Sequence, residues 1–168
     1  MKILIYGLGH IGGSLALGIK KYYKDLYEIS FIDKDKKTIK NARKQMLRSG
    51  DLPGTPFEND SIRSADIIFI CIDPSKIKNV FKKIKKLETK KNLIITDVAS
   101  TKVNILSDAK SILGKEIAFV GGHPIAGTEN SGFDHADPDL FKGKTFIQSG
   151  SIGFKKNISV VLNIWKKL

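Results

Sequence analysis

The residues that could carry chemistry are a glycine-rich turn near the N-terminus and polar side chains in three later segments. The turn reads Gly7-Leu8-Gly9-His10-Ile11-Gly12 and has the spacing G-x-G-x-x-G. Such a turn lets the backbone approach a pyrophosphate closely, and the helix that follows offers unpaired N–H groups to the phosphates. Because 15 glycines in 168 residues also produce chance matches, the spacing alone is a weak indication.

The context of the turn strengthens the prediction of a dinucleotide site. A strand-like run, Lys2 to Tyr6, precedes the turn, and Ile11 to Tyr23 continues as a helix. Asp33 follows 21 residues after Gly12, where its carboxylate can accept hydrogen bonds from the adenosine ribose. A carboxylate there repels a 2′-phosphate, so NAD is favoured over NADP, although neighbouring lysines soften that preference. The alternative is a structural glycine turn in another doubly wound protein.

Three later segments are expected to meet the ligands, because these bind beyond the carboxyl ends of the strands in a doubly wound sheet. Asp73 and Pro74 follow a buried strand; they are expected to start a helix and to border the nicotinamide half of the cofactor. In the turn TDVASTK, either Ser100 or Thr101 caps the next helix, or Ser100 faces a substrate.

His123 stands at the beginning of a long glycine-rich loop that starts at Gly121. A loop that is costly to order often serves function, and the unperturbed pKa of histidine suits proton transfer near neutral pH. A catalytic histidine is therefore favoured here over a structural one.

The composition limits which other classes of protein and kinds of site the sequence can represent. The single cysteine, Cys71, excludes an internal disulfide and a thiolate-rich metal site, and no metal is expected. The longest apolar run, Ile67 to Ile72, is far shorter than the roughly 20 residues of a membrane helix, and the N-terminus lacks a signal-peptide layout. A cytoplasmic protein without a membrane partner is expected.

The net charge of +12 could attract nucleic acid or other polyanions. The distribution of the charge favours another interpretation, because lysines fill the gaps between helically spaced apolar residues from Pro74 to Leu87. That pattern describes a solvated helix face, and no nucleic-acid recognition motif accompanies it. We expect no nucleic-acid partner, and the charge can steer anionic small molecules instead.

Alternating strands and helices must position these residues. Regular alternation implies a parallel sheet with helices on both faces. The segment Ser49 to Ser64 is rich in Gly, Pro and polar residues and is expected to be irregular. Further strands are expected at Tyr27 to Asp33, Asp66 to Ile72, Asn92 to Thr96, Ile117 to Gly121 and Lys144 to Gln148, and further helices at Asp35 to Arg48, Pro74 to Leu87, Lys102 to Leu113 and Asn157 to Leu168.

A resemblance to a known family is carried by four segments, GLGHIGGS, FID, TDVASTK and GGHPIAGTENSGFDHADPDLFKGKTFI. From Met1 to about Phe146 the chain resembles the prephenate/arogenate dehydrogenase family. The fourth segment is the most specific, because HPIAGTE-x-SGF followed by LF-x-GK is not expected from other Rossmann enzymes. The resemblance implies that residues 1–168 form a Rossmann-type doubly wound domain. In the family a helical C-terminal domain, absent here, makes the homodimer and completes the site, so the chain is expected to be part of a longer polypeptide.

The resemblance also implies an activity, the NAD-dependent oxidative decarboxylation of prephenate to 4-hydroxyphenylpyruvate in tyrosine biosynthesis. His123 would assist the ring hydroxyl in losing its proton as hydride departs, and Ser100 would orient the same hydroxyl. Glu129, with Thr128 before it, would lie near the substrate entrance. The alternatives are an arogenate dehydrogenase and a non-catalytic NAD-binding module without the substrate domain, although the presence of both His123 and Ser100 argues against the latter.

Overall fold

The computed structural model describes residues 1–46, 58–127 and 129–168. Within these residues six strands form one sheet in the order β2-β1-β3-β4-β5-β6. Strands β1 to β5 are parallel, and β6 runs antiparallel to β5 at the edge of the sheet. The expected mostly parallel sheet is therefore confirmed. The strands are β1 (Lys2–Tyr6), β2 (Glu28–Ile32), β3 (Ile67–Ile70), β4 (Ile94–Asp97), β5 (Ala118–Pro124) and β6 (Phe146–Ile152).

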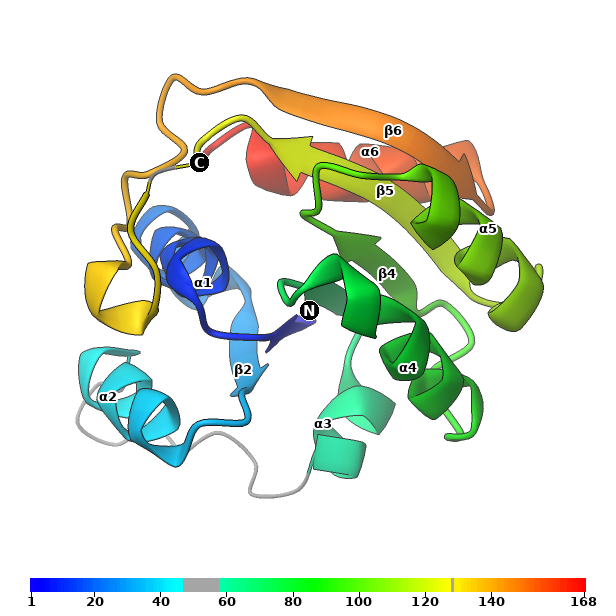
Figure 1. Ribbon diagram of the computed structural model, residues 1–168, viewed down its shortest axis with the longest axis horizontal. Helices are drawn as coiled ribbons and strands as arrows, with labels where there is room; N and C mark the ends of the chain where they lie inside the picture. Colours follow the sequence, from blue (N-terminus) through cyan, green and yellow to red (C-terminus); the bar gives the residue numbers. More distant parts are fainter. Residues whose placement is uncertain (47–57, 128) are drawn as a thin grey trace.

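Helices cover both faces of the sheet, as expected for a doubly wound fold (Figure 1). Because crossover helices hide both faces of the central strands, all four residues of β3 are buried and apolar. None of the helices in the described residues is long and apolar enough to cross a membrane. One face carries α1 (His10–Tyr23), α2 (Lys36–Met46) and α6 (Lys155–Trp165), and the other carries α3 (Glu58–Ser64), α4 (Pro74–Lys85) and α5 (Val103–Ile112).

Part of the segment expected to be irregular is helical. Residues 58–64 form α3, so the expectation for Ser49 to Ser64 is wrong there, while residues 49–57 lie outside the described residues, as do the last two of the helix expected to reach Arg48. Two acidic residues in the first turn of α3 complement the helix dipole, and Ile62 is fully buried against the sheet. The Gly and Pro residues that suggested a loop all precede this helix.

Strand β5 is longer than the sequence suggested. It continues to Pro124 because β6 pairs with its last residues, and His123 lies opposite Ile147 in that ladder. The expectation that His123 begins a loop is therefore wrong. The antiparallel pairing holds the histidine on a strand, which positions its ring more rigidly than a loop would.

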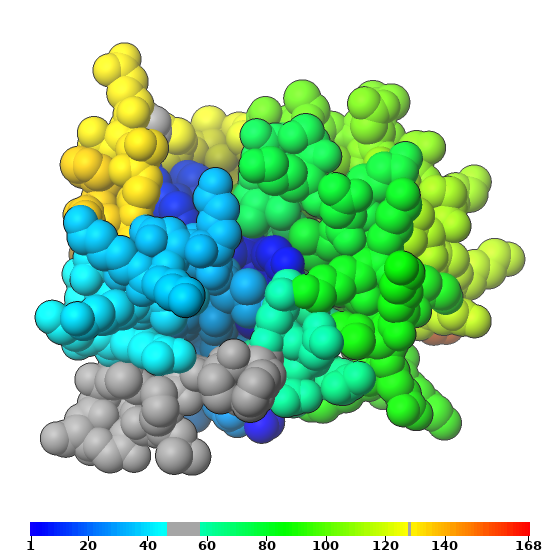
Figure 2. All heavy atoms as spheres, turned by 60° about the horizontal axis from the view of Figure 1, so that its bottom comes forward, coloured from blue at the N-terminus to red at the C-terminus, as the bar shows by residue number. Residues whose placement is uncertain are grey.

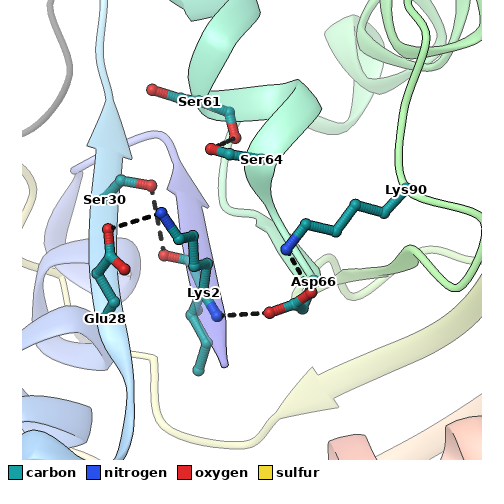
Figure 3. Close-up of polar contacts among 8 residues, drawn as sticks. Lys2, Glu28, Ser30, Ser61, Ser64, Asp66 and Lys90 are labelled. Atoms are coloured by element: carbon teal, nitrogen blue, oxygen red, sulfur yellow. Dashed lines mark hydrogen bonds and ion pairs between the residues drawn. The ribbon is translucent and has the colours of Figure 1, made fainter.

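At the amino ends of the strands, Asp66 joins three segments of the chain (Figure 3). Its carboxylate accepts hydrogen bonds from the Lys2 amide at 2.7 Å and from the Lys90 ammonium at 2.6 Å. Nearby, the Lys2 ammonium lies 3.2 Å from a carboxylate oxygen of Glu28 at the start of β2. This edge is opposite to the one where ligands of such sheets bind, so we regard these contacts as structural.

Trp165 anchors α6 to the sheet. Its ring stacks on Phe146 of β6, with centroids 4.6 Å apart, and meets Phe141 edge-on at 5.0 Å and Phe69 of β3 at 6.1 Å. Since Trp165 is buried, this aromatic cluster ties α6, the edge strand and the centre of the sheet into one core.

We expect Trp165→Ala to lower the free energy of unfolding by about 3–5 kcal/mol, because the truncation leaves a cavity among three aromatic rings. Urea unfolding followed by circular dichroism measures the change. The matched control is Phe154→Ala, at a residue that is 74% exposed, and it should cost no more than about 0.5 kcal/mol. Equal losses in the two variants would contradict this description of the core.

Candidate functional site

The candidate site lies at the carboxyl edge of the sheet. Beyond the ends of β1, β2 and β3 opens a cavity of about 710 Å³. Figure 2 shows this hollow between the blue-to-cyan segment of β2 and α2 and the green segment of α4, with N-terminal residues at its floor. Four of the residues predicted to bind a cofactor line it, namely Gly7, Gly9, Asp33 and Asp73.

The glycine turn is shaped by close packing at two positions. Gly7 has a φ of +101°, which side-chain-bearing residues rarely adopt, and a Cβ there would lie 2.5 Å from the carbonyl oxygen of Cys71. A Cβ on Gly12 would lie 2.0 Å from the carbonyl oxygen of Gly7. These two glycines are therefore required by the protein itself, because the turn, α1 and β3 pack against one another.

Gly9 is different, because nothing in the described residues requires a glycine there. Its φ of −66° suits any residue, and a Cβ would meet no atom within 4 Å. Since Gly9 lines the cavity, a side chain would project into the space that a ligand could occupy. Gly9 is also the N-cap of α1 and carries no side chain that could accept from the first helical turn, whose N–H groups are the ones that bind a phosphate in such sites.

The other predicted residues of the turn are not among those that line the cavity. Leu8 is fully buried, His10 is buried as the first residue of α1, and Ile11 is partly buried against the core. Any contact of these residues with a ligand would therefore be made by the backbone. Their side chains serve the packing of the turn.

Asp33 has a second task that its position in the sequence did not reveal. One carboxylate oxygen accepts a hydrogen bond from the Leu8 amide at 2.7 Å, and the other accepts one from the Asp35 amide at 2.9 Å. The carboxylate thus holds the glycine turn against the end of β2. Each oxygen keeps a further lone pair, so Asp33 can also accept from a ribose hydroxyl in the cavity.

The segment after β3 starts a helix as expected. Asp73 is the N-cap of α4, and its carboxylate accepts from the amide of Ser75 at 2.9 Å and from the Ser75 hydroxyl at 2.7 Å. Pro74 occupies the first helical position, where its missing N–H costs nothing. The structural role of Asp73 is therefore established, and its place on the cavity wall permits a role in binding as well.

Asp97 organises the part of the edge where the sequence predicts catalysis. Its carboxylate is fully buried at the end of β4 and accepts hydrogen bonds from the amides of Ala99 at 3.1 Å and Gly122 at 3.3 Å. The side chain of Lys102 is 11% exposed; its ammonium lies 2.7 Å from the carboxylate and also donates to the Ala99 carbonyl. Burial raises the pKa of Asp97, and the hydrogen bonds from Lys102 and the amides oppose that rise.

The same turn sets the orientation of His123. The imidazole is partly buried beyond the end of β4, with Nδ1 3.2 Å from the carbonyl oxygen of Val98. Because a carbonyl only accepts, this hydrogen bond requires a proton on Nδ1, and in the neutral ring Nε2 is then free to accept a proton. The structure thus brings the predicted histidine and the TDVASTK turn together at the carboxyl edge.

Three of the predicted site residues remain, namely Ser100, Glu129 and Thr128. Ser100 is exposed, and α5 has Lys102 as its N-cap without a side-chain cap hydrogen bond, so the capping role considered for Ser100 is wrong. Glu129 is exposed. Thr128 lies outside the described residues.

A thiol nucleophile and a metal site are the other two kinds of chemistry that residue types in this chain could suggest. Burial, with the negative charge of Asp97 as a further cause, raises the pKa of Cys71 strongly, which disfavours the thiolate, the nucleophilic form. In the described residues no three His, Cys, Asp or Glu side chains gather as metal ligands would.

Sequence reasoning missed two groups. The D-x-x-S-x-K spacing could have revealed the pair of Asp97 and Lys102, because both lie in one turn. Nothing in the sequence points to the second group, in which Glu58 accepts a hydrogen bond from the Tyr6 hydroxyl and pairs with Lys83. These three residues come from β1, α3 and α4 and meet only in the folded chain.

Fold, glycine turn and cavity together define a nucleotide-binding domain of the Rossmann type. The family model described as "Prephenate dehydrogenase, nucleotide-binding domain" matches residues 15–168. The chain therefore belongs to the prephenate dehydrogenase family, whose members are oxidoreductases, and it corresponds to their nucleotide-binding part.

Individual relatives agree with this assignment. The chain is 35% identical over 147 residues to the prephenate dehydrogenase of Lactococcus lactis subsp. cremoris, which is 87% of this chain and 40% of that protein. The crystal structure of prephenate dehydrogenase from Aquifex aeolicus, in complex with hydroxyphenyl propionate and NAD+, superposes with a TM-score of 0.85 at 28% identity over 99% of this chain and 57% of that one.

The Synechocystis arogenate dehydrogenase gives a TM-score of 0.83 at 26% identity, over 99% of this chain and 56% of that one. The chain spans less than half the length of the curated relatives that it matches.

We expect Lys102→Met to lower the free energy of unfolding by about 3–5 kcal/mol at neutral pH, because it leaves the Asp97 carboxylate buried without its cation. The folded-state pKa of Asp97 is already raised above its ordinary 3.8, and the variant should raise it further. Stability then falls as pH rises through the folded-state pKa, and the defect should vanish below pH 3.8.

Urea unfolding at a series of pH values measures this effect. The control is Lys110→Met on the exposed surface of α5, which should be near neutral at every pH. A defect of Lys102→Met that does not depend on pH would contradict the assignment of its cause to the buried carboxylate.

Proposed function

We propose that the chain binds NAD, with the pyrophosphate against the turn at Gly9 and the adenosine ribose at Asp33. The observation that carries this proposal is the unfilled space at Gly9, where neither backbone nor packing requires a glycine. The NAD+ complex of the Aquifex aeolicus relative supports the same cofactor. NAD is preferred to NADP because a carboxylate at Asp33 repels a 2′-phosphate.

Gly9→Val tests this binding mode. We expect the free energy of unfolding to change by no more than about 1 kcal/mol, because a Cβ at this position meets no neighbour within 4 Å and the backbone angles suit a residue with a side chain. The dissociation constant for NAD, measured by calorimetry, should rise at least about tenfold, because the side chain occupies the phosphate cradle. Unchanged affinity for NAD would contradict the proposed position of the pyrophosphate.

The second part of the proposal is the oxidative decarboxylation of prephenate. When bound, the nicotinamide accepts hydride from the ring carbon that bears the hydroxyl. His123 removes the hydroxyl proton at Nε2, the nitrogen that its bond to Val98 leaves free, and Ser100 holds the same hydroxyl in place. Loss of CO2 leaves its bonding electron pair in the ring, which becomes aromatic, and the proton returns from Nε2 of His123 to the phenolate oxygen to give 4-hydroxyphenylpyruvate, the step that leads to tyrosine.

We also propose roles for groups other than His123 and Ser100. Glu129, with Thr128 before it in the sequence, would serve the substrate entrance, and a helical C-terminal domain would supply the contacts to the substrate carboxylates and the homodimer interface. The expected location is the cytoplasm.

Arogenate is the second candidate substrate, and the likeness to the Synechocystis arogenate dehydrogenase favours it to a similar degree. The two substrates differ only in a keto or an amino group on the side chain, and both carry the ring hydroxyl that His123 would serve. Turnover of each substrate by the full-length gene product separates the two. Binding of NAD without turnover of either would indicate a non-catalytic module.

In the full-length gene product, His123→Asn should lower kcat by about a hundredfold or more while KM changes little, because the proton acceptor acts in the transition state. Steady-state kinetics with prephenate, or arogenate if that is the better substrate, measures both constants. An unchanged kcat would remove His123 from the mechanism.

A further inference from the structure

Three polar side chains form a network on the wall of the cavity. The Tyr6 hydroxyl donates to one carboxylate oxygen of Glu58, and the Lys83 ammonium pairs with the other. All three residues line the cavity, and the side chain of Glu58 remains 34% exposed. The carboxylate is thus held from two sides while a ligand can still reach it.

The network shares one cavity with the proposed contacts of the cofactor. Gly9 and Asp33, the proposed contacts of pyrophosphate and ribose, line this cavity together with Ile72 and Val80. Apolar side chains of this kind suit the faces of a flat aromatic base. Because Glu58 lines the same cavity, its carboxylate is available to the edge of such a base.

The ionisation of Glu58 limits what it can recognise. Burial would raise its pKa, but the hydrogen bonds from Lys83 and Tyr6 outweigh burial and hold the pKa below its ordinary value. The ionised carboxylate only accepts hydrogen bonds, and each oxygen retains a lone pair beyond its present partner. A donor on the base is therefore attracted, and a carbonyl oxygen in the same place is repelled.

We infer that Glu58 is the residue that selects the base of the cofactor, by accepting a hydrogen bond from the 6-amino group of adenine. This inference rests on the proposed dinucleotide binding. It adds that the cavity distinguishes 6-aminopurine from 6-oxopurine dinucleotides. Tyr6 and Lys83 are positioning residues, because they keep the carboxylate from turning toward the N1–H donor of a 6-oxopurine.

A purely structural role for Glu58 makes a different prediction. If the carboxylate only fastens α3 to β1 and α4, its replacement changes stability without changing which base is preferred. Selectivity between two dinucleotides that differ only at the base therefore separates the two roles. Hypoxanthine serves as the probe, because it replaces the 6-amino group by an oxygen while the rest of the dinucleotide stays the same.

The experiment measures dissociation constants of the 168-residue chain for NAD and for nicotinamide hypoxanthine dinucleotide by calorimetry. The original chain should bind NAD at least about tenfold more tightly, which is the range for one hydrogen bond to a charged group. Glu58→Gln should bring the ratio close to one, because the side-chain amide can also donate to the 6-oxygen. The control Glu88→Gln, at an exposed position after α4, should keep the ratio of the original chain.

Two results would overturn the inference and leave the proposed cofactor in place. One is equal affinity of the original chain for the two dinucleotides; the other is a ratio that Glu58→Gln leaves unchanged in a variant with the circular dichroism spectrum of the original. Failure of the original chain to bind NAD at all would instead overturn the proposed function and this inference with it.

Discussion

The proposed chemistry depends on one buried carboxylate. Asp97 ends β4 and accepts hydrogen bonds from the amide of Gly122 on β5 and from its own turn, where Lys102 balances its charge. Burying a charge is unfavourable unless it is paired and hydrogen-bonded, so few conformations of the turn that follows β4 are compatible with the buried Asp97 carboxylate. The closed turn presents the Val98 carbonyl to Nδ1 of His123, and that contact leaves Nε2 as the proton acceptor. Asp97, which touches no substrate, thus helps to set which ring nitrogen of neutral His123 carries the proton.

At the other half of the carboxyl edge, a second carboxylate, that of Asp33, has two roles. Asp33 holds the Leu8 amide, and so the glycine turn, while it faces the cavity where a ribose would lie. Gly7 and Gly12 let the turn pack against β3 and α1, whereas Gly9 leaves the cavity open. Since parallel strands end at the same edge of a sheet, this half and the His123 half lie side by side along it. The residues that line the cavity come from β1 to α4, and we propose that the nicotinamide half of one extended dinucleotide reaches past β3 to His123.

Much of this arrangement could be predicted from local sequence. The G-x-G-x-x-G turn, the acidic end of β2 and the alternation of strands and helices each follow from short-range rules. What could not be predicted depends on contacts between distant segments. The length of β5, and with it the position of His123 on a strand, is set by pairing with β6. Glu58 begins a helix that follows a stretch rich in Gly and Pro, and its partners Tyr6 and Lys83 are far away in the sequence.

We propose above all that the nicotinamide ring and the imidazole of His123 meet at one edge of the sheet. Nuclear Overhauser effects in the isotope-labelled chain, saturated with NAD, test this most directly. The account predicts a cross-peak between the proton on C4 of the nicotinamide and the Hε1 proton of His123. Strong contacts of the nicotinamide protons with the side chains of α2 or β2, without any to His123, would contradict it.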